Sequence, residues 1–282
     1  MEKNNINGAL IINKETNMTS RDVVNLLCKK LNTKTIGHIG TLDPLATGVL
    51  VCLIGKYTRL TNILINHDKE YIASFKLGML TDTLDITGKV LKEEKYNVDK
   101  DKLINILNSF KGNFLQEVPL YSAIKVNGKK LYEYARNNEK VVLPKREITI
   151  YDINLINIEN DIVTIKTKVS KGTYIRSLIR DIGIKLGTYA TMTALKRTKL
   201  GNFNIENAYS LEDIENGNFS VLSLEDLIDI ETVNINDEDY FKIKNGQVLD
   251  RNADKYILFK YNNQEVALYQ KYNNKIKPLI MF

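Results

Sequence analysis

An alternation of apolar and polar residues runs through Glu70-Tyr71-Ile72-Ala73-Ser74-Phe75-Lys76-Leu77, and it predicts a strand with one buried face. Residues 162–169 alternate in the same way. Three other segments, 19–31, 102–110 and 173–186, place apolar residues at helical spacing. Because strands and helices interleave without strict strand–helix alternation, we expect an α+β domain built on a mixed or antiparallel sheet.

The C-terminal part of the chain shows a separate pattern of short candidate strands. We expect them at 256–261, 265–270 and 276–282, separated by Asn-rich turns. A module of about 50 residues is near the lower limit for independent stability, so it should pack against the rest of the protein. The sequence therefore predicts two domains, residues 1–231 and a small β module at 232–282.

Charge is distributed unevenly along a chain of ordinary globular composition. The 282 residues are 43% hydrophobic and 26% charged, a composition that excludes disordered, collagenous and coiled-coil classes, and the net charge is +6. Residues 162–200 hold nine basic residues and one acid, whereas the acidic helical stretch 206–231, at the end of the first domain, holds eight acids and no base. Such polarity is typical of a surface that binds a polyanion, although a solvated charged face explains it equally well.

The cysteine and histidine content argues against a disulfide framework or a metal centre. Cys28 and Cys52 have no Cys-x-x-Cys neighbour, and neither His38 nor His67 lies in a ligand-like spacing. We expect two reduced core cysteines and no metal. The apolar run Val49 to Ile54 is too short for a membrane span or a signal-peptide core, so we expect a cytoplasmic protein without membrane contact.

A chemically informative segment is Gly37-His38-Ile39-Gly40-Thr41-Leu42-Asp43-Pro44-Leu45-Ala46-Thr47-Gly48-Val49-Leu50, which has the composition of a shaped loop before an apolar strand. Its glycines permit tight turns, and Pro44 keeps Asp43 out of the α region, so the loop presents a carboxylate. An isolated Asp-Pro is also the ordinary start of a helix, with Asp as the N-cap. The segment alone leaves a functional and a capping role for Asp43 open.

Several separated motifs together resemble the TruB family of tRNA pseudouridine synthases. The resemblance covers residues 8–203, about two thirds of the chain. The motifs that carry it are Gly37–Leu50, Lys69–Gly78, Thr81–Gly88, Val118–Lys125 and Ser170–Leu178. Five dispersed motifs make the resemblance highly specific. It implies the catalytic fold of pseudouridine synthases, and the C-terminal module resembles, more weakly, a reduced RNA-binding PUA-like domain.

The resemblance assigns roles to residues in these motifs. It implies that Asp43 is the essential aspartate, that Tyr71 lies against the everted uracil and helps to remove the C5 proton, and that Arg176 is the active-site arginine. The residues implied to hold the base or the phosphates of the substrate are His38, Tyr174, Leu195, Asp85, Lys14 and Lys125. Lys129 and the basic stretch 162–200 would add phosphate contacts that read the shape of an A-form stem.

Without the resemblance, each of these residues has a plainer interpretation. Tyr71 is a core aromatic on a strand face, and His38 is an ordinary loop residue. Arg176 and Arg180, four residues apart on a helix, are surface phosphate contacts. The resemblance instead implies that His38 fills the place of the displaced base, and that a bidentate pair with Arg176 keeps Asp43 ionised.

Departures from the family pattern are local. Glu15 and Leu120 stand where proline is common, which affects the stiffness of two loops. Lys196 precedes Arg197 where a pair of arginines is frequent, a change that keeps the charge but loses one bidentate fork for phosphate.

The reaction implied by the resemblance converts uridine 55 in the T-arm of tRNA to pseudouridine. The target base is everted, its N1–sugar bond is broken, and C5 is joined to the same sugar carbon with the participation of Asp43. Such an isomerisation needs no cofactor and no metal. Because no long basic tail is present, we expect the enzyme to act without a guide RNA or protein partner. We also expect a monomer. Two alternatives stay open: a module or chaperone that grips the T-arm without modifying it, and a guide-RNA-dependent relative.

Overall fold

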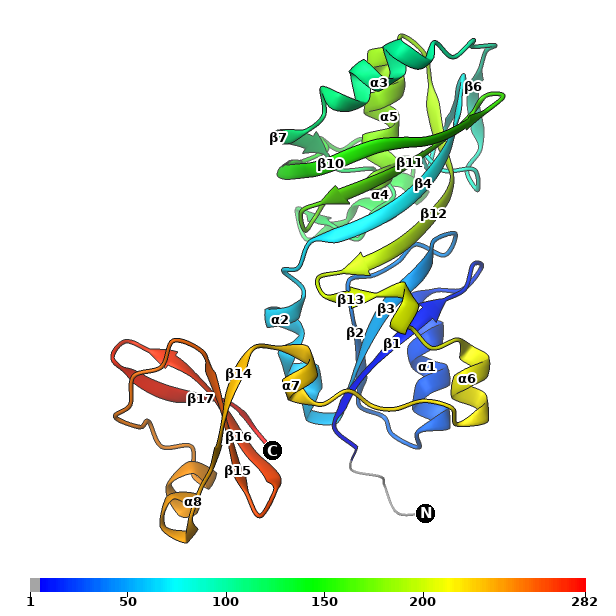
Figure 1. The fold of residues 1–282 in the computed structure, drawn as a ribbon. Helices are drawn as coiled ribbons and strands as arrows, with labels where there is room; N and C mark the ends of the chain where they lie inside the picture. Colours follow the sequence, from blue (N-terminus) through cyan, green and yellow to red (C-terminus); the bar gives the residue numbers. More distant parts are fainter. Residues whose placement is uncertain (1–5) are drawn as a thin grey trace.

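The computed structural model describes residues 6–282, which form one long mixed sheet, helices packed on it, and a smaller C-terminal sheet (Figure 1). The long sheet has nine strands, seven of them in the spatial order β1 (Gly8–Lys14), β3 (Thr47–Ile54), β12 (Ala190–Leu200), β4 (Lys69–Leu77), β11 (Ile162–Val169), β10 (Lys145–Glu159) and β7 (Gly112–Glu117). The other two strands are β2 (Ile36–Ile39), which pairs with β3, and β13 (Phe203–Asn204), which pairs with β12. The predicted α+β class with a mixed sheet is confirmed.

One seam in this sheet differs from the rest. All neighbouring strands are antiparallel except β3 and β12, which run parallel. Their pairing consists of two residue pairs, Thr47 with Lys196 and Gly48 with Arg197. The seam therefore joins the half of the sheet that contains β1, β2 and β3 to the half that contains β4, β11, β10 and β7 (Figure 1).

The two strands predicted from alternation are confirmed, since β4 covers Lys69–Leu77 and β11 covers Ile162–Val169. The side chains that the alternation assigns to one face of β4 are all buried: Tyr71, Ala73, Phe75 and Leu77. The apolar run Val49–Ile54 belongs to β3 and is buried on both faces. Its even-numbered residues face one hydrophobic core and its odd-numbered residues face the other, which explains a run without polar interruption.

Three helices cover one face of the long sheet. They are α1 (Ser20–Lys30), α3 (Lys100–Asn108) and α5 (Ile175–Leu186). Thr19 and Asp22 form a capping box that starts α1 close to its predicted position. The helix expected at 173–186 begins two residues later, because residues 170–173 form a turn in which Thr173 Oγ1 donates to Ser170 O.

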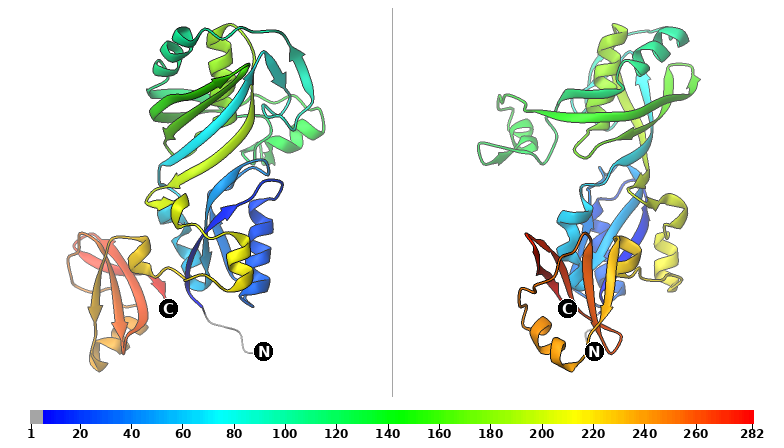
Figure 2. Two further views of the ribbon diagram at one scale, coloured as in Figure 1. Left: turned by 45° about the vertical axis from the view of Figure 1, so that its right-hand side comes forward. Right: turned by 60° about the vertical axis from the view of Figure 1, so that its left-hand side comes forward.

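Short helices complete the first domain, and a hairpin projects from it. The short helices are η1 (Gly55–Leu60, a 3-10 helix), α2 (Thr61–Leu64), η2 (Ile205–Asn207, a 3-10 helix), α6 (Leu211–Asn216) and α7 (Leu224–Leu227). The two-stranded units are β5 (Met79–Thr81) with β6 (Val90–Glu93), and β8 (Lys125–Val126) with β9 (Lys129–Lys130). The β8–β9 hairpin and α4 (Leu131–Arg136) stand out from the body of the domain (Figure 2).

The C-terminal sheet has four strands in the order β14 (Ile230–Asn234), β15 (Tyr256–Tyr261), β16 (Gln264–Tyr272) and β17 (Lys275–Met281). The three predicted strands are present, whereas β14 and α8 (Asp237–Lys244) were not predicted. The boundary predicted between residues 231 and 232 falls within β14, and the two-domain division stays a prediction. As expected, this sheet packs on the first domain: Leu258, Leu268 and Ile280 share a core with β3 and η1.

Both cysteines are free and sit in or against the core. Cys52 is buried and Cys28 is half-buried. Burial raises the pKa of the Cys52 thiol to about 12, so this thiol stays protonated. Within residues 6–282 no helix is long and apolar enough to cross a membrane. The same residues contain no group of three or more His, Cys, Asp or Glu side chains suited to a metal ion.

Candidate active site

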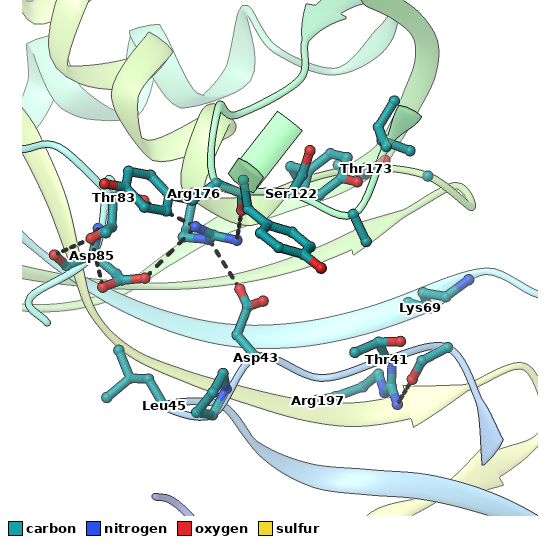
Figure 3. Close-up of a pocket in the computed structure, with 18 of the residues that line it drawn as sticks. Thr41, Asp43, Leu45, Lys69, Thr83, Asp85, Ser122, Thr173, Arg176 and Arg197 are labelled. Atoms are coloured by element: carbon teal, nitrogen blue, oxygen red, sulfur yellow. Dashed lines mark hydrogen bonds and ion pairs between the residues drawn. The ribbon is translucent and has the colours of Figure 1, made fainter. Parts of the chain in front are cut away.

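A cleft of about 1220 Å³ lies on the helix-covered face of the sheet, beside the β3–β12 seam. Segments far apart in the sequence line it, including residues 40–45, 121–124 and 171–174 (Figure 3). A smaller hollow of about 110 Å³ shares part of this lining. The predicted site residues that line one or both cavities are Asp43, Tyr71, Asp85, Tyr174, Arg176 and Leu195. The fold thus brings together six of the nine predicted residues, and their roles stay predictions.

Asp43 lies on a short connection, residues 40–46, between β2 and β3. No helix begins at Pro44; instead Ala46 N donates to Asp43 O at 3.0 Å and closes a turn. The capping interpretation is therefore wrong. The Asp43 side chain is 38% exposed and faces the cleft, while Leu42 on its N-terminal side is buried.

The connection that carries Asp43 is held from two sides. On one side Lys14 Nζ donates to Pro44 O at 3.3 Å, and Ser20 Oγ accepts from Leu42 N at 2.9 Å. On the other side Arg197 donates through Nη2 to Gly40 O at 2.9 Å and through Nε to Val49 O at 2.7 Å. The connection is therefore positioned by the end of β1 and the first residue of α1 on one side and by β12 on the other, which favours a fixed direction for the carboxylate.

Arg176 is the centre of the polar contacts in the cleft. Its Nε lies 3.0 Å from Asp43 Oδ2. Its Nη1 donates to Thr83 O at 3.0 Å and its Nη2 donates to Tyr121 O at 3.1 Å. The guanidinium is buried and points toward Asp43 (Figure 3). The structure shows one contact to Asp43, through Nε, rather than the predicted bidentate pair, while Nη1 and Nη2 each donate one of their two N–H groups to a backbone carbonyl.

Asp85 supplies a second carboxylate beside Arg176. Its Oδ2 lies 3.8 Å from Arg176 Nη1. Its Oδ1 accepts from Thr83 Oγ1 at 2.9 Å, from Thr87 Oγ1 at 2.5 Å and from Thr87 N at 3.0 Å. A carboxylate that is buried and held by three donors stays in place. We infer that Asp85 balances and orients the Arg176 guanidinium, so that Asp43 needs only one contact to it.

Two tyrosines and a leucine form the walls of the small hollow. Tyr71 and Leu195 are buried on adjacent strands, β4 and β12, and Tyr174 precedes α5. The Tyr71 hydroxyl has no hydrogen-bond partner in the described part of the chain, which leaves it available to a ligand. Burial raises the pKa of the Tyr174 phenol, with Arg146 opposing the shift, so the phenol stays protonated at neutral pH.

Three predicted substrate contacts lie elsewhere. Lys14 is fully buried, and its ammonium donates to the carbonyls of Glu15, Met18 and Pro44, so it is not available to phosphate. Burial lowers the pKa of Lys14 to about 8, against the attraction of Asp43. Lys125 is exposed on the projecting hairpin and lines neither cavity.

His38 is on strand β2 rather than on a loop, and it does not line the cleft or the small hollow. Its Nδ1 is buried without a partner among residues 6–282. Burial, helped by Arg21 and Arg197, lowers the pKa of this imidazole, so His38 is neutral at pH 7. The role of filling the place of the everted base stays a prediction.

Much of the basic stretch 162–200 is not directed at the cleft. Lys166 and Lys168 lie on the face of β11 opposite to that of Tyr71 on β4, and Lys166 pairs with Glu70 at 3.3 Å. Arg180 pairs with Glu117 and Asp181. Outside this stretch, Lys129 pairs with Glu139 at 2.6 Å. The surface available to bind phosphates is therefore smaller than the number of basic residues in this stretch suggests.

Basic residues that the sequence did not single out line the cleft instead. They are Arg136 and Arg146, and they are joined there by Lys69 of the Lys69–Gly78 motif and by Lys171 and Arg197 of the basic stretch. Arg136 and Arg146 lie in the stretch 125–146, which holds seven basic residues and two acids, so the sequence carries a second local excess of positive charge there. Only the fold, which brings β4, α4, β10 and β12 to one cleft, shows their convergence.

Comparisons with known proteins agree with this fold and site. Residues 28–175 match the model of the TruB family pseudouridylate synthase N-terminal domain, and residues 176–239 match the tRNA pseudouridylate synthase B C-terminal domain. A tRNA pseudouridine synthase B of Fusobacterium nucleatum is 52% identical over 199 residues, which cover 71% of this chain and 69% of that protein. One from Mesoplasma florum is 39% identical over 276 residues, 96% of each chain.

Solved structures with the same fold come from a Cbf5-Nop10-Gar1 complex and an H/ACA ribonucleoprotein. A chain of a Cbf5-Nop10-Gar1 complex has a TM-score of 0.68 and 26% identity, and the match covers 93% of this chain and 78% of that chain. A chain of an H/ACA ribonucleoprotein bound to a substrate RNA containing 2'-deoxyuridine has a TM-score of 0.67 and 25% identity, with coverages of 93% and 77%.

Proposed function

The chain belongs to the TruB family of pseudouridylate synthases and is an isomerase of tRNA uridine, and we propose that it modifies uridine 55 in the T-arm without a guide RNA. The observation that carries the proposal is the Asp43–Arg176 contact at 3.0 Å inside a cleft lined by basic residues. Asp43, the more exposed of the two carboxylates beside a fixed guanidinium, suits a reaction that needs one ionised oxygen.

The proposed reaction conserves every atom of the nucleoside. The N1–C1′ bond of the target uridine breaks, the uracil turns, a C5–C1′ bond forms, and the C5 proton is removed while N1 regains a proton. Asp43 takes part as a nucleophile or as a base, and Arg176 with Asp85 holds its carboxylate in position. The free Tyr71 hydroxyl in the small hollow supports its proposed role in removal of the C5 proton.

Base eversion is the second part of the proposal. A stacked uridine cannot reach Asp43, and extrusion costs on the order of a few kcal/mol, which contacts in the pocket offset. The small hollow lined by Asp43, Tyr71, Tyr174 and Leu195 is the proposed seat of the everted uracil. Phosphates of the flanking strand would lie along the basic residues of the larger cleft.

Independence from a guide RNA is supported by the pattern of relatives. The Mesoplasma florum protein named tRNA pseudouridine synthase B is 39% identical over nearly its whole length, whereas the chains from the Cbf5-Nop10-Gar1 complex and the H/ACA ribonucleoprotein are 26% and 25% identical. We further propose that the enzyme acts as a monomer in the cytoplasm. That the C-terminal sheet is a PUA-like RNA-binding module is also a proposal.

Mapping of pseudouridine in tRNA treated with the purified protein tests this function. We expect conversion at position 55 alone, without added RNA or protein, and loss of conversion in Asp43→Asn with RNA binding retained. Modification that requires a guide RNA would favour the guide-dependent alternative. An Asp43→Asn protein that still releases the C5 hydrogen at the normal rate would show that the carboxylate is not used.

A further inference from the structure

Two buried cations lie side by side on one wall of the cleft. Lys69 opens β4 and Arg197 lies on β12, and their exposed fractions are 9% and 1%. An added Cβ at Gly40 would meet Arg197 Nη1 at 3.3 Å and Lys69 Cε at 3.7 Å, so both side chains converge on this glycine. In Figure 3 they lie together near Thr41, away from the Asp43–Arg176 pair.

Neither cation has a carboxylate partner. Among residues 6–282, no Asp or Glu oxygen lies within 4.0 Å of the charged nitrogens of Lys69 or Arg197. Lys69 Nζ donates to His67 O at 2.8 Å and Ile65 O at 3.5 Å, and Arg197 donates to Gly40 O and Val49 O. Neutral carbonyls satisfy hydrogen bonds but leave both charges uncompensated, which is unusual for buried Lys and Arg.

The surroundings increase this excess of positive charge. Burial, together with Arg197 and Lys171, lowers the pKa of Lys69 to about 8, while Asp68 opposes the shift. Lys171 is exposed at the edge of the cleft, where its Nζ donates to Asn66 Oδ1 at 2.8 Å. Arg197 Nη1 has no acceptor in the described chain and borders the cleft. Unused donors and unbalanced charge at one place indicate an anionic ligand.

We propose that Lys69 and Arg197 bind a backbone phosphate of the RNA strand directly beside the everted uridine. The inference rests on the proposed function, since the phosphate belongs to that substrate. Lys69 and Tyr71 are two residues apart on the same face of β4, so their Cα atoms are separated by about 7 Å. A nucleotide whose base lies against Tyr71 therefore has its own or its neighbour's phosphate within reach of a long lysine side chain. An ammonium and a guanidinium offer the donors that phosphate oxygens accept.

Equilibrium binding of a labelled T-arm stem-loop tests the site. We expect Lys69→Gln to raise Kd about 10-fold and to reduce the slope of log K against log salt by about 0.7 to 1, the value of one lost phosphate contact. The matched control is Lys100→Gln, at an exposed lysine on α3 outside the cleft. It should change Kd and the salt slope only by the small amount that the loss of one distant positive charge causes. Equal effects of the two substitutions on Kd and slope would overturn the proposal.

Neutral linkages locate the phosphate without any protein variant. Stem-loops with one methylphosphonate, placed 5′ or 3′ of the target uridine, are compared with the unmodified RNA. We expect one of the two linkages to weaken binding by the wild type about 10-fold, and the same linkage to add little to the loss in Lys69→Gln. If neither linkage weakens binding, or if the losses are fully additive, Lys69 does not contact that phosphate.

The outcomes separate this site from the proposed function. Pseudouridine formation by the wild type is measured in the same stem-loop. No product would contradict the proposed function, whereas normal product formation without coupling between Lys69 and a linkage would contradict the phosphate site alone. Lys69→Arg, which keeps the charge, should restore most of the affinity, and a variant that fails to do so would indicate that Lys69 acts only through packing.

Discussion

Arg176 gives the clearest test at the scale of single residues, because its three nitrogens make three different contacts. In Arg176→Lys one ammonium cannot replace contacts to Asp43, Thr83 O and Tyr121 O at once. We expect kcat to fall at least about 100-fold, or about 2.7 kcal/mol in the barrier, with little change in Kd. Single-turnover kinetics would measure this.

The neighbouring arginine on the same helix is the control for this substitution. Arg180 pairs with Glu117 and Asp181 and does not line the cleft. Arg180→Lys should therefore keep nearly normal turnover. Full turnover in Arg176→Lys, or equal losses in both variants, would mean that the specific shape of the Arg176 guanidinium is not required.

Lys69 predicts a pH dependence of RNA binding. Since the pKa of Lys69 is lowered to about 8 in the free protein, its charge is present below that pH and is lost above it. The titratable and charged groups around it are Arg197, Lys171, Asp68 and His67, and Lys69 itself contributes to the lowered pKa of His67. The affinity for the stem-loop should therefore decrease as pH rises through about 8, and Lys69→Arg should remove this decrease because arginine stays charged. Binding measured from pH 6.5 to 9.5 checks it, and an unchanged profile in Lys69→Arg would contradict the assignment.

The sequence was a better guide to the residues proposed to act on the substrate than to the residues that hold the active-site loop in position. The distance between Asp43 and Arg176 agrees with the resemblance, but the sequence did not indicate the burial of Lys14, which was expected to hold phosphate, or of Arg197. Both are long cations that the fold buries against backbone carbonyls. A short stretch of sequence shows that a residue is charged but does not show whether a distant segment will bury it. Buried cations of this kind can therefore be recognised only in the tertiary structure.

At the scale of elements, the parallel β3–β12 seam depends on a glycine. Gly48 has φ +99°, and an added Cβ would lie 2.2 Å from Arg197 O. We expect Gly48→Ala to destabilise the protein by about 3 kcal/mol or more, through backbone strain and a clash with a strand. Gly217→Ala, at a similar positive φ but with no atom within 4 Å of the added Cβ, should cost about 1 kcal/mol. Urea unfolding measures both, and equal losses would show that the close approach at the seam is not important.

Elements with strong periodicity were predicted closely, and the others were not. β4, β11 and α1 differ from their expected bounds by a residue or less. α8 begins with three acids and buries little beyond Ile243, so it lacks an apolar stripe. β14 is a five-residue edge strand whose partner, β15, lies more than 20 residues later, and such a parallel pairing leaves no local turn signal.

At the scale of the whole molecule, a partly buried contact joins η1 to the C-terminal sheet. Tyr57 Oη donates to Glu265 Oε1 at 2.6 Å, and the Tyr57 ring also meets Phe282. Burial raises the pKa of Glu265, with the Tyr57 hydrogen bond opposing the shift. A raised carboxyl pKa contributes stability at low pH that is lost as pH rises through the folded-state value.

The substitution Glu265→Gln should remove this pH-dependent term while keeping an acceptor for Tyr57. We expect the stability of Glu265→Gln relative to the wild type to increase as pH rises from 4 and then to level off. Thermal unfolding across this range, with the exposed α8 substitution Glu238→Gln as control, measures the trend. A constant difference between Glu265→Gln and wild type at all pH values would show that Glu265 titrates normally.

The seam has one more consequence. Asp43 belongs to the connection before β3, and Arg176 belongs to the helix that packs on the other half of the sheet, so the carboxylate proposed to react and the cation beside it are contributed by opposite sides of a joint made of two residue pairs. A fragment that ends before β12 would fold with an incomplete centre, however well its strands formed. During synthesis on the ribosome, the active site should therefore become complete late and in a single step, when Arg197 leaves the exit tunnel and packs beside Gly48.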